Sequence, residues 1–195
     1  MGPPYLDRTN NPFLYSLIPR RNVFVSYFHG DQGWAQTFVD AFGKGLNKVF
    51  TPKALGLSYD DDEIQSSDPN YVMGQIRERK IVDSTVQIVL IGPCTHSRRY
   101  IDWEIKRCSS NGNGLVGILI PPHISAHLPE RFQENYCSDG QCYARFYFYP
   151  QSRELLTSWI EDAYEARSSR RQLVRNVREA WGYNKTCSVC GYTHN

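Results

Sequence analysis

The sequence predicts an α/β protein with a flavodoxin-like fold, in which a five-stranded parallel sheet of strand order 2-1-3-4-5 carries helices on both faces. Two observations support this prediction. Strand-like and helix-like segments alternate along the chain. Two of the strand-like segments, TVQIVLIG and LVGILIP, are apolar on both faces, as the middle strands of a parallel sheet are. Because crossovers between parallel strands are right-handed, few other topologies remain.

Each element is predicted from hydrophobic spacing and from the residues that interrupt it. Branched and aromatic residues in RNVFVSYF predict the first strand. Trp34, Phe38 and Phe42 recur at helical intervals, in a helix that Asp31 can cap and that glycines end. In chain order, strands are predicted at 21–28, 47–52, 85–92, 115–121 and 144–150, and helices at 31–46, 70–84, 97–110 and 152–181.

Three segments fall outside this regular pattern. Residues 1–20 are rich in Pro and Asn and are interpreted as a leader, followed by one domain over 21–182 and a Cys- and His-containing tail over 183–195. Residues 53–70, which include YDDDE, are predicted to form a long polar loop. The helix predicted over 152–181 has two apolar stripes, separated by ARSSRR, which is either a break or a solvated bend.

Composition limits the classes of function. The chain has 195 residues and a net charge of +2, which gives no argument for nucleic-acid binding. It has no apolar run of about 18 residues, so no transmembrane helix is expected. Its start lacks the apolar core of a signal peptide, and Leu6 stands where myristoylation needs Ser or Thr. A cytoplasmic protein without membrane attachment is therefore expected.

Six cysteines are expected to be free thiols, because no secretion signal is present. CSVCGYTH is a C-x2-C pair followed by a histidine, which is one half of a zinc-site pattern. One hypothesis is a structural zinc site that combines this pair with the more distant CSDGQC pair, and the alternative is a frayed tail without metal. The zinc ligands would be Cys137, Cys142, Cys187 and Cys190.

The predicted topology locates a ligand site without the help of any motif. In an open parallel sheet, ligands bind at the carboxyl ends of the strands, where the strand order reverses. The loop SYFHGD follows the first strand and GPCTHSRR follows the third, so both loops should flank one crevice. The charged and aromatic residues of SRRYIDWEI, which begin the next helix, are then expected beside that crevice.

Several common uses of this topology do not fit. A phosphoacceptor receiver needs an Asp at the end of the third strand, where this chain has Ile91, Gly92 and Pro93. A flavodoxin needs a phosphate loop rich in Ser and Thr after the first strand, where this chain is bulky and aromatic. The chain contains no P-loop, no dinucleotide-fold glycine motif and no G-x-S-x-G nucleophile elbow.

The motifs that remain resemble the TIR family. Ser97, Tyr100, Glu104 and Ile105 match the spacing of Ser, aromatic residue, catalytic Glu and aliphatic residue on the helix after the third strand in TIR enzymes, although Trp is commoner than Tyr there. The likeness is closest to the TIR-like proteins of the Thoeris anti-phage system. VFVSYFHGD resembles their VFxSFHxxD, and VLIGPCTHSRRYIDWEI resembles their VLIGxxTxxRRWVxxEI. The resemblance covers residues 21–120.

The resemblance implies an enzyme that cleaves NAD between ribose and nicotinamide, with Glu104 as the catalytic residue. NAD would be the substrate, and no tightly bound cofactor is expected. The product would be ADP-ribose, a cyclic isomer or a conjugate that activates a partner effector, after a phage-derived trigger and with homo-oligomerisation as an option. The substrate-binding candidates are Ser26, Tyr27, Phe28, His29, Asp31, Ser97, Arg99 and Tyr100.

The expected chemistry is consistent with a single carboxylate. Glycosidases commonly need two carboxylates, one of which protonates a poor leaving group. Nicotinamide in NAD is already cationic and leaves as a neutral molecule, so one carboxylate that stabilises the transition state is enough. Arg98 and Arg99 are candidates for the pyrophosphate, and one of them is expected in a structural ion pair. Two alternatives stay open at this point: a TIR-like scaffold without activity, and a sensor that binds a nucleotide without cleaving it.

Overall fold

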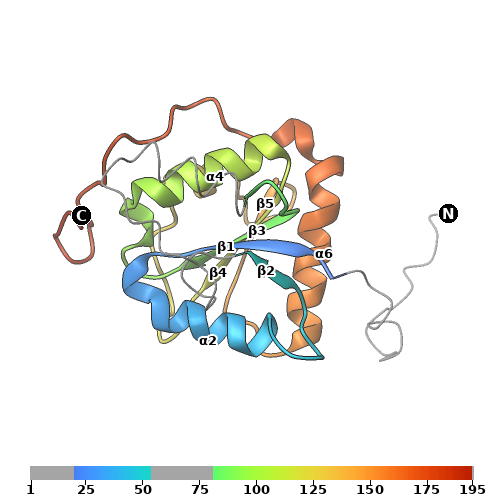
Figure 1. Ribbon diagram of the computed structural model, residues 1–195. Helices are drawn as coiled ribbons and strands as arrows, with labels where there is room; N and C mark the ends of the chain where they lie inside the picture. Colours follow the sequence, from blue (N-terminus) through green and yellow to red (C-terminus); the bar gives the residue numbers. More distant parts are fainter. Residues whose placement is uncertain (1–19, 54–80, 195) are drawn as a thin grey trace.

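The computed structural model describes residues 20–53 and 81–194. Its sheet confirms the predicted architecture, with five parallel strands in the order β2-β1-β3-β4-β5 (Figure 1). The strands are β1 (Asn22–Ser26), β2 (Thr51–Lys53), β3 (Val86–Ile91), β4 (Gly114–Leu119) and β5 (Ala144–Tyr147). The helices are α2 (Gln32–Phe42), α4 (Arg99–Asn111), α5 (Glu130–Glu134) and α6 (Arg153–Ser169), with 3-10 turns η2 (His29–Asp31), η4 (Thr95–Ser97) and η5 (Arg171–Leu173).

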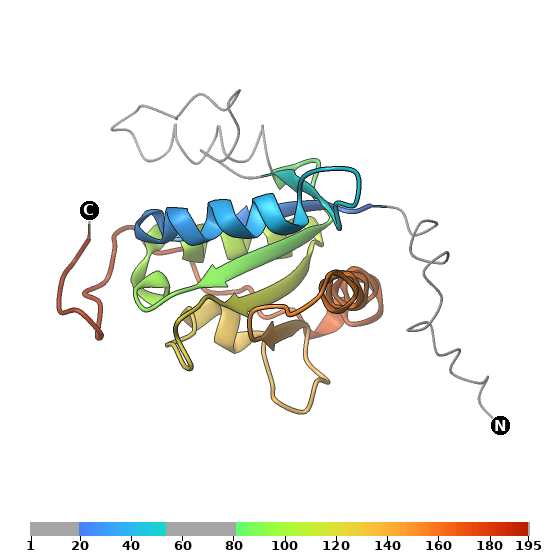
Figure 2. The ribbon, with the colours of Figure 1, turned by 90° about the horizontal axis from the view of Figure 1, so that it is seen from below.

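The helices form a layer on each face of the sheet (Figures 1 and 2). On one face, α2 and α6 bury Phe38 and Ile160 against Val25 and Ile88. On the other face, α4 and α5 pack against the remaining side chains of β3 and β4. Because side chains alternate along a strand, each central strand supplies both cores, which explains why β3 and β4 are buried at every position.

The chain after α6 differs from the sequence prediction. The helix predicted over 152–181 ends at Ser169, and after the short turn η5 the chain runs along α4 without further helix (Figure 1). Val177, predicted to lie on an apolar stripe, is 96% exposed. The reason lies in the polar neighbours of that stripe. The side chain of Asn176 donates to the Lys106 carbonyl at 2.8 Å, and Arg178 pairs with Asp102 at 2.6 Å.

Some predictions lie outside the described residues. These are the leader except for its last residue, the acidic loop with YDDDE, and all but the end of the helix predicted over 70–84. The stretch between β4 and β5 contains the short helix α5, which is not among the predicted helices. In the part of the chain that the structure describes, no helix combines the length and the apolar character that a bilayer span requires.

Candidate functional site

Glu104 lies on the face of α4 that packs against the sheet. Its neighbours on that face, Ile101, Ile105 and Cys108, are almost fully buried, and Glu104 itself is only 7% exposed. Within the described residues its Oε2 atom has no hydrogen-bond partner. A buried carboxylate oxygen without a partner is uncommon, because removing such a group from water is unfavourable. Glu104 is therefore not a solvated residue on the exposed face of the helix.

The Glu104 carboxylate borders a pocket of about 140 Å³ at the carboxyl end of β1. The other lining residues are Phe24 and Val25 from β1 and Tyr27 and His29 from the loop that follows it. This is the switch point of the sheet, because β1 pairs with β2 on one side and with β3 on the other. The structure thus brings three of the predicted site residues, Tyr27, His29 and Glu104, to one pocket.

A short chain of hydrogen bonds positions the carboxylate. The amide Nε2 of Gln87, a fully buried residue of β3, donates to the hydroxyl of Ser26 at 2.8 Å. Because that bond occupies the hydroxyl oxygen as an acceptor, the Ser26 proton is free to point to Glu104, with which Ser26 makes a side-chain hydrogen bond. Ser26 of β1 and Gln87 of β3 therefore orient the Glu104 carboxylate.

Burial dominates the protonation of Glu104. Removal from water raises the pKa of its carboxyl group from 4.5 to about 8, and the hydrogen bond from Ser26 lowers it only in part. Burial therefore favours the protonated form of Glu104 at neutral pH. A cation placed in the pocket would favour the ionised form, so the site is suited to a positively charged ligand.

Asp31 lies on the other side of the β1 loop. It occupies the position before α2, but its side chain makes no capping hydrogen bond. Its carboxylate instead lies against the backbone of Gly92, where any Cβ atom would collide with it. Burial raises the pKa of Asp31, while His123, Thr95 and Arg98 act in the opposite direction. Asp31 therefore links the two loops that were predicted to flank the crevice.

Arg98 stabilises the loop after β3 through several contacts. The guanidinium of Arg98 donates to the Cys94 carbonyl at 3.0 Å and to the Ser97 hydroxyl at 2.7 Å. It also lies 4.6 Å from the centre of the Phe28 ring, which is a cation–π contact. Ser97 is almost completely buried in these contacts. Arg98, Ser97 and Phe28 thus join the loops after β1 and β3 beside the pocket.

Arg99 and Tyr100 point to a different part of the molecule. The Arg99 guanidinium donates to the Gly182 carbonyl at 3.1 Å and to the Tyr100 hydroxyl at 3.0 Å. The Arg99 backbone N–H donates to the side chain of Asn184 at 2.9 Å. Neither side chain is among those that line the pocket with Glu104. In this structure the two residues hold the segment that leads to the C-terminal tail.

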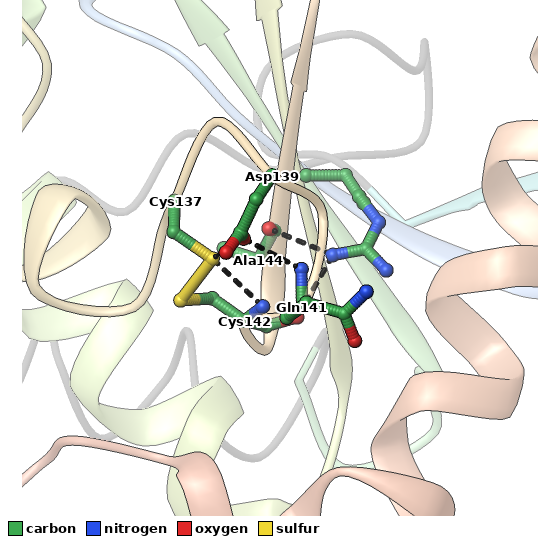
Figure 3. The surroundings of a disulfide bond; sticks show 6 residues. Cys137, Asp139, Gln141, Cys142 and Ala144 are labelled. Carbon is green, nitrogen blue, oxygen red and sulfur yellow. Dashed lines mark hydrogen bonds between the residues drawn. A yellow bond between two sulfur atoms is a disulfide. The ribbon is translucent and has the colours of Figure 1, made fainter.

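The structure does not bring together the four cysteines of the predicted zinc site. Cys137 and Cys142 form a disulfide in the turn before β5, with 5.5 Å between their Cα atoms (Figure 3). Cys187 and Cys190 lie near Cys94, beyond the carboxyl end of β3 and so at the opposite edge of the sheet. The expectation of free thiols holds for Cys94, Cys108, Cys187 and Cys190 and is wrong for the disulfide pair.

Two contributions to the site were missed in the sequence. Gln87 was included in a strand interpreted as wholly apolar, and the one available signal was its amide within VQIVLI. Such a polar residue in a fully buried strand needs partners, and Ser26 provides one. Phe24 and Val25 line the pocket as ordinary strand residues. Their spacing in the sequence is that of ordinary core residues, so it could not identify them as pocket residues.

A parallel sheet of order 2-1-3-4-5, with a buried carboxylate on the helix after the third strand, defines a TIR-like protein. Comparison with known families agrees. The family model described as "Thoeris protein ThsB, TIR-like domain" matches residues 24–123, and the chain belongs to this family. It is thus a TIR protein of anti-phage defence, and membership of the Thoeris system implies a signalling partner. A search of the curated proteins found no match.

Proposed function

We propose that this protein cleaves NAD between the ribose and the nicotinamide, with Glu104 as the catalytic carboxylate. The observation that carries the proposal is the buried Oε2 atom of Glu104, which has no partner among the described residues and lies at the pocket where the strand order reverses. Membership of the Thoeris TIR-like family supports it. The ADP-ribose product, cyclised or joined to another acceptor, would be the signal that activates the partner effector.

The chemistry requires little from the protein beyond one negative charge. The bond between C1′ of the ribose and the ring nitrogen breaks, and its electron pair stays with nicotinamide, which leaves as a neutral molecule. Positive charge then develops on the ribose, and the ionised Glu104 stabilises it. In hydrolysis, water adds to C1′ and releases one proton. An internal nucleophile of ADP-ribose in place of water gives a cyclic product.

The electrostatics of Glu104 fit such a substrate. Glu104 has a pKa of about 8 when no ligand is bound, and the fixed positive charge of nicotinamide in NAD would lower it. The carboxylate would thus become fully ionised when its substrate arrives. Tyr27 and His29 line the same pocket and would contact the nicotinamide and ribose end of the molecule. The pocket of about 140 Å³ suits that end alone, and the rest of NAD would extend outside it.

The test is release of nicotinamide from NAD, measured by chromatography, for the full chain with an extract of phage-infected cells as the trigger. We expect Glu104→Gln to reduce the rate at least about 100-fold. Glu179→Gln is the matched control, because it makes the same chemical change at an exposed carboxylate on the surface. Mass spectrometry of the products identifies the ADP-ribose derivative.

The other outcomes are equally informative. Equal release by wild type and Glu104→Gln would contradict the assignment of the catalytic residue. Bound but intact NAD would indicate a nucleotide sensor, and the absence of both binding and cleavage would indicate a scaffold. Glu104→Gln is expected to stay folded, because glutamine keeps the shape of the side chain and removes a buried charge.

A further inference from the structure

Four side chains that commonly bind metals meet at one point outside the pocket. Cys94 comes from the loop after β3, and Cys187, Cys190 and His194 come from the C-terminal tail. Their ligand atoms all lie within 4.8 Å of one another. The Cys94 sulfur is 3.3 Å from that of Cys187 and 3.6 Å from that of Cys190, and the Cys190 sulfur is 3.0 Å from Nε2 of His194.

These distances are close to the edges of a zinc tetrahedron. With Zn–S bonds of about 2.3 Å, two sulfurs bound to one zinc ion lie about 3.7 Å apart. The sulfur separations of 3.3 and 3.6 Å need only small adjustments to reach that value. Three cysteines and one histidine also form a closed donor set, which is typical of structural rather than catalytic zinc.

The tail is shaped to present its ligands. The backbone N–H groups of Val189 and Cys190 donate to the Cys187 sulfur and hold it in the turn. The next residue, Gly191, has a φ of +76°, which residues with a Cβ rarely adopt, and its N–H donates to the Cys187 carbonyl at 2.8 Å. The tight turn CSVCG therefore directs two sulfurs to one point.

The surrounding charge also suits a metal centre of this composition. A zinc ion with three thiolates and a neutral imidazole has a net charge of about −1. Arg98 lies close enough to interact electrostatically with all three cysteines, and its guanidinium donates to the His194 carbonyl at 3.1 Å. This cation can balance the negative charge and holds the backbone of the fourth ligand.

We propose that Cys94, Cys187, Cys190 and His194 bind one structural zinc ion. The ion joins the tail to the loop after β3, a few residues before the start of α4, which carries Glu104. A disulfide does not explain the arrangement as well, because it would use two of the three sulfurs and leave the imidazole beside the third without a role. The ring of His194 also packs against Phe28 at 5.1 Å, so the centre adjoins both loops of the crevice.

The test is the zinc content of the full-length protein, purified without chelators and measured by inductively coupled plasma mass spectrometry. We expect about one zinc per chain. Cys190→Ser should lower the content at least about tenfold. Cys190 is an exposed residue, so its replacement leaves the core intact. Cys142→Ser is the matched control and should keep the zinc, because Cys142 belongs to the distant disulfide.

Cobalt substitution gives an independent measurement. The Co²⁺-loaded wild type should show thiolate-to-cobalt charge transfer and the visible bands of a tetrahedral site, both weakened by Cys94→Ser and unaffected by Cys142→Ser. A wild-type zinc content below about one-tenth per chain would overturn the proposal. Equal zinc in Cys190→Ser, or peptide mapping that finds a disulfide between any two of Cys94, Cys187 and Cys190, would also overturn it.

Discussion

Glu104 is placed where its charge is unfavourable for the fold and useful for chemistry. One oxygen receives a hydrogen bond from Ser26, and the other has no partner among the described residues. Replacing the charge by a neutral group of the same shape should therefore strengthen the fold while it removes the carboxylate. This opposition between stability and function can be measured, because it depends on pH.

We expect Glu104→Gln to be more stable than wild type, by an amount that grows with pH. The pKa of Glu104 is about 8 in the folded protein and 4.5 ordinarily, so between these values the folded state binds more protons than the unfolded state. Wild-type stability contributed by this group therefore falls as the pH rises through that window and stays low above it. At about pH 8 the variant should gain on the order of 1–4 kcal/mol, and at about pH 5 little.

Urea unfolding at both pH values measures this difference. Glu179→Gln serves as the control, because the Glu179 side chain is 92% exposed and its hydrogen bond with Lys106 lowers its pKa instead of raising it. If wild type and Glu104→Gln lost stability with pH at the same rate, the carboxyl group of Glu104 would not be the buried group inferred here.

At the scale of elements, the sequence was sufficient for the sheet and for a pocket at its switch point. Continuous apolar runs identified β3 and β4, and the topology rule then put Tyr27, His29 and Glu104 near one crevice. The prediction of a helix over 152–181 was wrong beyond Ser169. Helical spacing of Leu173 and Val177 could not reveal that neighbouring polar residues find partners on α4, about 70 positions earlier in the chain.

Contacts between residues far apart in the sequence also limited the prediction of the cysteine sites. Cys94 and Cys187 are separated by 93 positions, and only the folded chain shows that their sulfurs are 3.3 Å apart. The C-x2-C pair was visible in the sequence, but the choice of its partners was not. The hydrogen bond of Gln87 to Ser26 was hidden for the same reason, because it joins two strands that are adjacent only in the sheet.

Asp102 is the residue that fixes α4 to its surroundings. Its carboxylate accepts two hydrogen bonds from Arg131, which is fully buried, and pairs with Arg178 at 2.6 Å. It also accepts a bond from the backbone N–H of Trp181 at 3.1 Å. We expect Asp102→Ala to lower the free energy of unfolding by about 3–5 kcal/mol, because it leaves the Arg131 charge buried without its partner.

The comparison that makes this prediction specific is Lys106→Ala, on the same helix. Lys106 pairs with the exposed Glu179 at 2.7 Å, and loss of such a surface pair should change the free energy of unfolding by at most about 1 kcal/mol. Denaturant unfolding of both variants gives the two values. Similar values for the two variants would mean that the Asp102 network does not hold α4 as described.

At the scale of the whole molecule, the two edges of the sheet carry different structural features. The carboxyl edge carries the pocket, the bracing of the two loops and the proposed metal centre, whereas the disulfide of Cys137 and Cys142 lies at the other edge. The tail reaches the carboxyl edge by running along α4 (Figure 1). Loss of the metal should therefore lower the local stability of the carboxyl edge and not that of the whole fold.

Hydrogen exchange after removal of zinc by a chelator tests this locality. We expect faster exchange of the amides that depend on the attached tail, because local opening of a segment exposes its hydrogen bonds without unfolding the core. The reporting amides are those of Lys185, which donates to the Ser97 carbonyl at 2.9 Å, and of Cys187 and Gly191. Amides within β3 and β4 should keep their protection, since both strands are fully buried.

Two variants decide whether such a change comes from the proposed ligands. Cys142→Ser should respond to the chelator as wild type does, because its disulfide lies at the other edge. Cys190→Ser should exchange rapidly in the tail from the start and gain nothing from the chelator, since one ligand is already missing. Acceleration spread evenly over the sheet would instead show that the metal stabilises the whole fold. No change in the tail would show that hydrogen bonds alone, such as that from Lys185 to Ser97, hold it against the edge that bears the pocket.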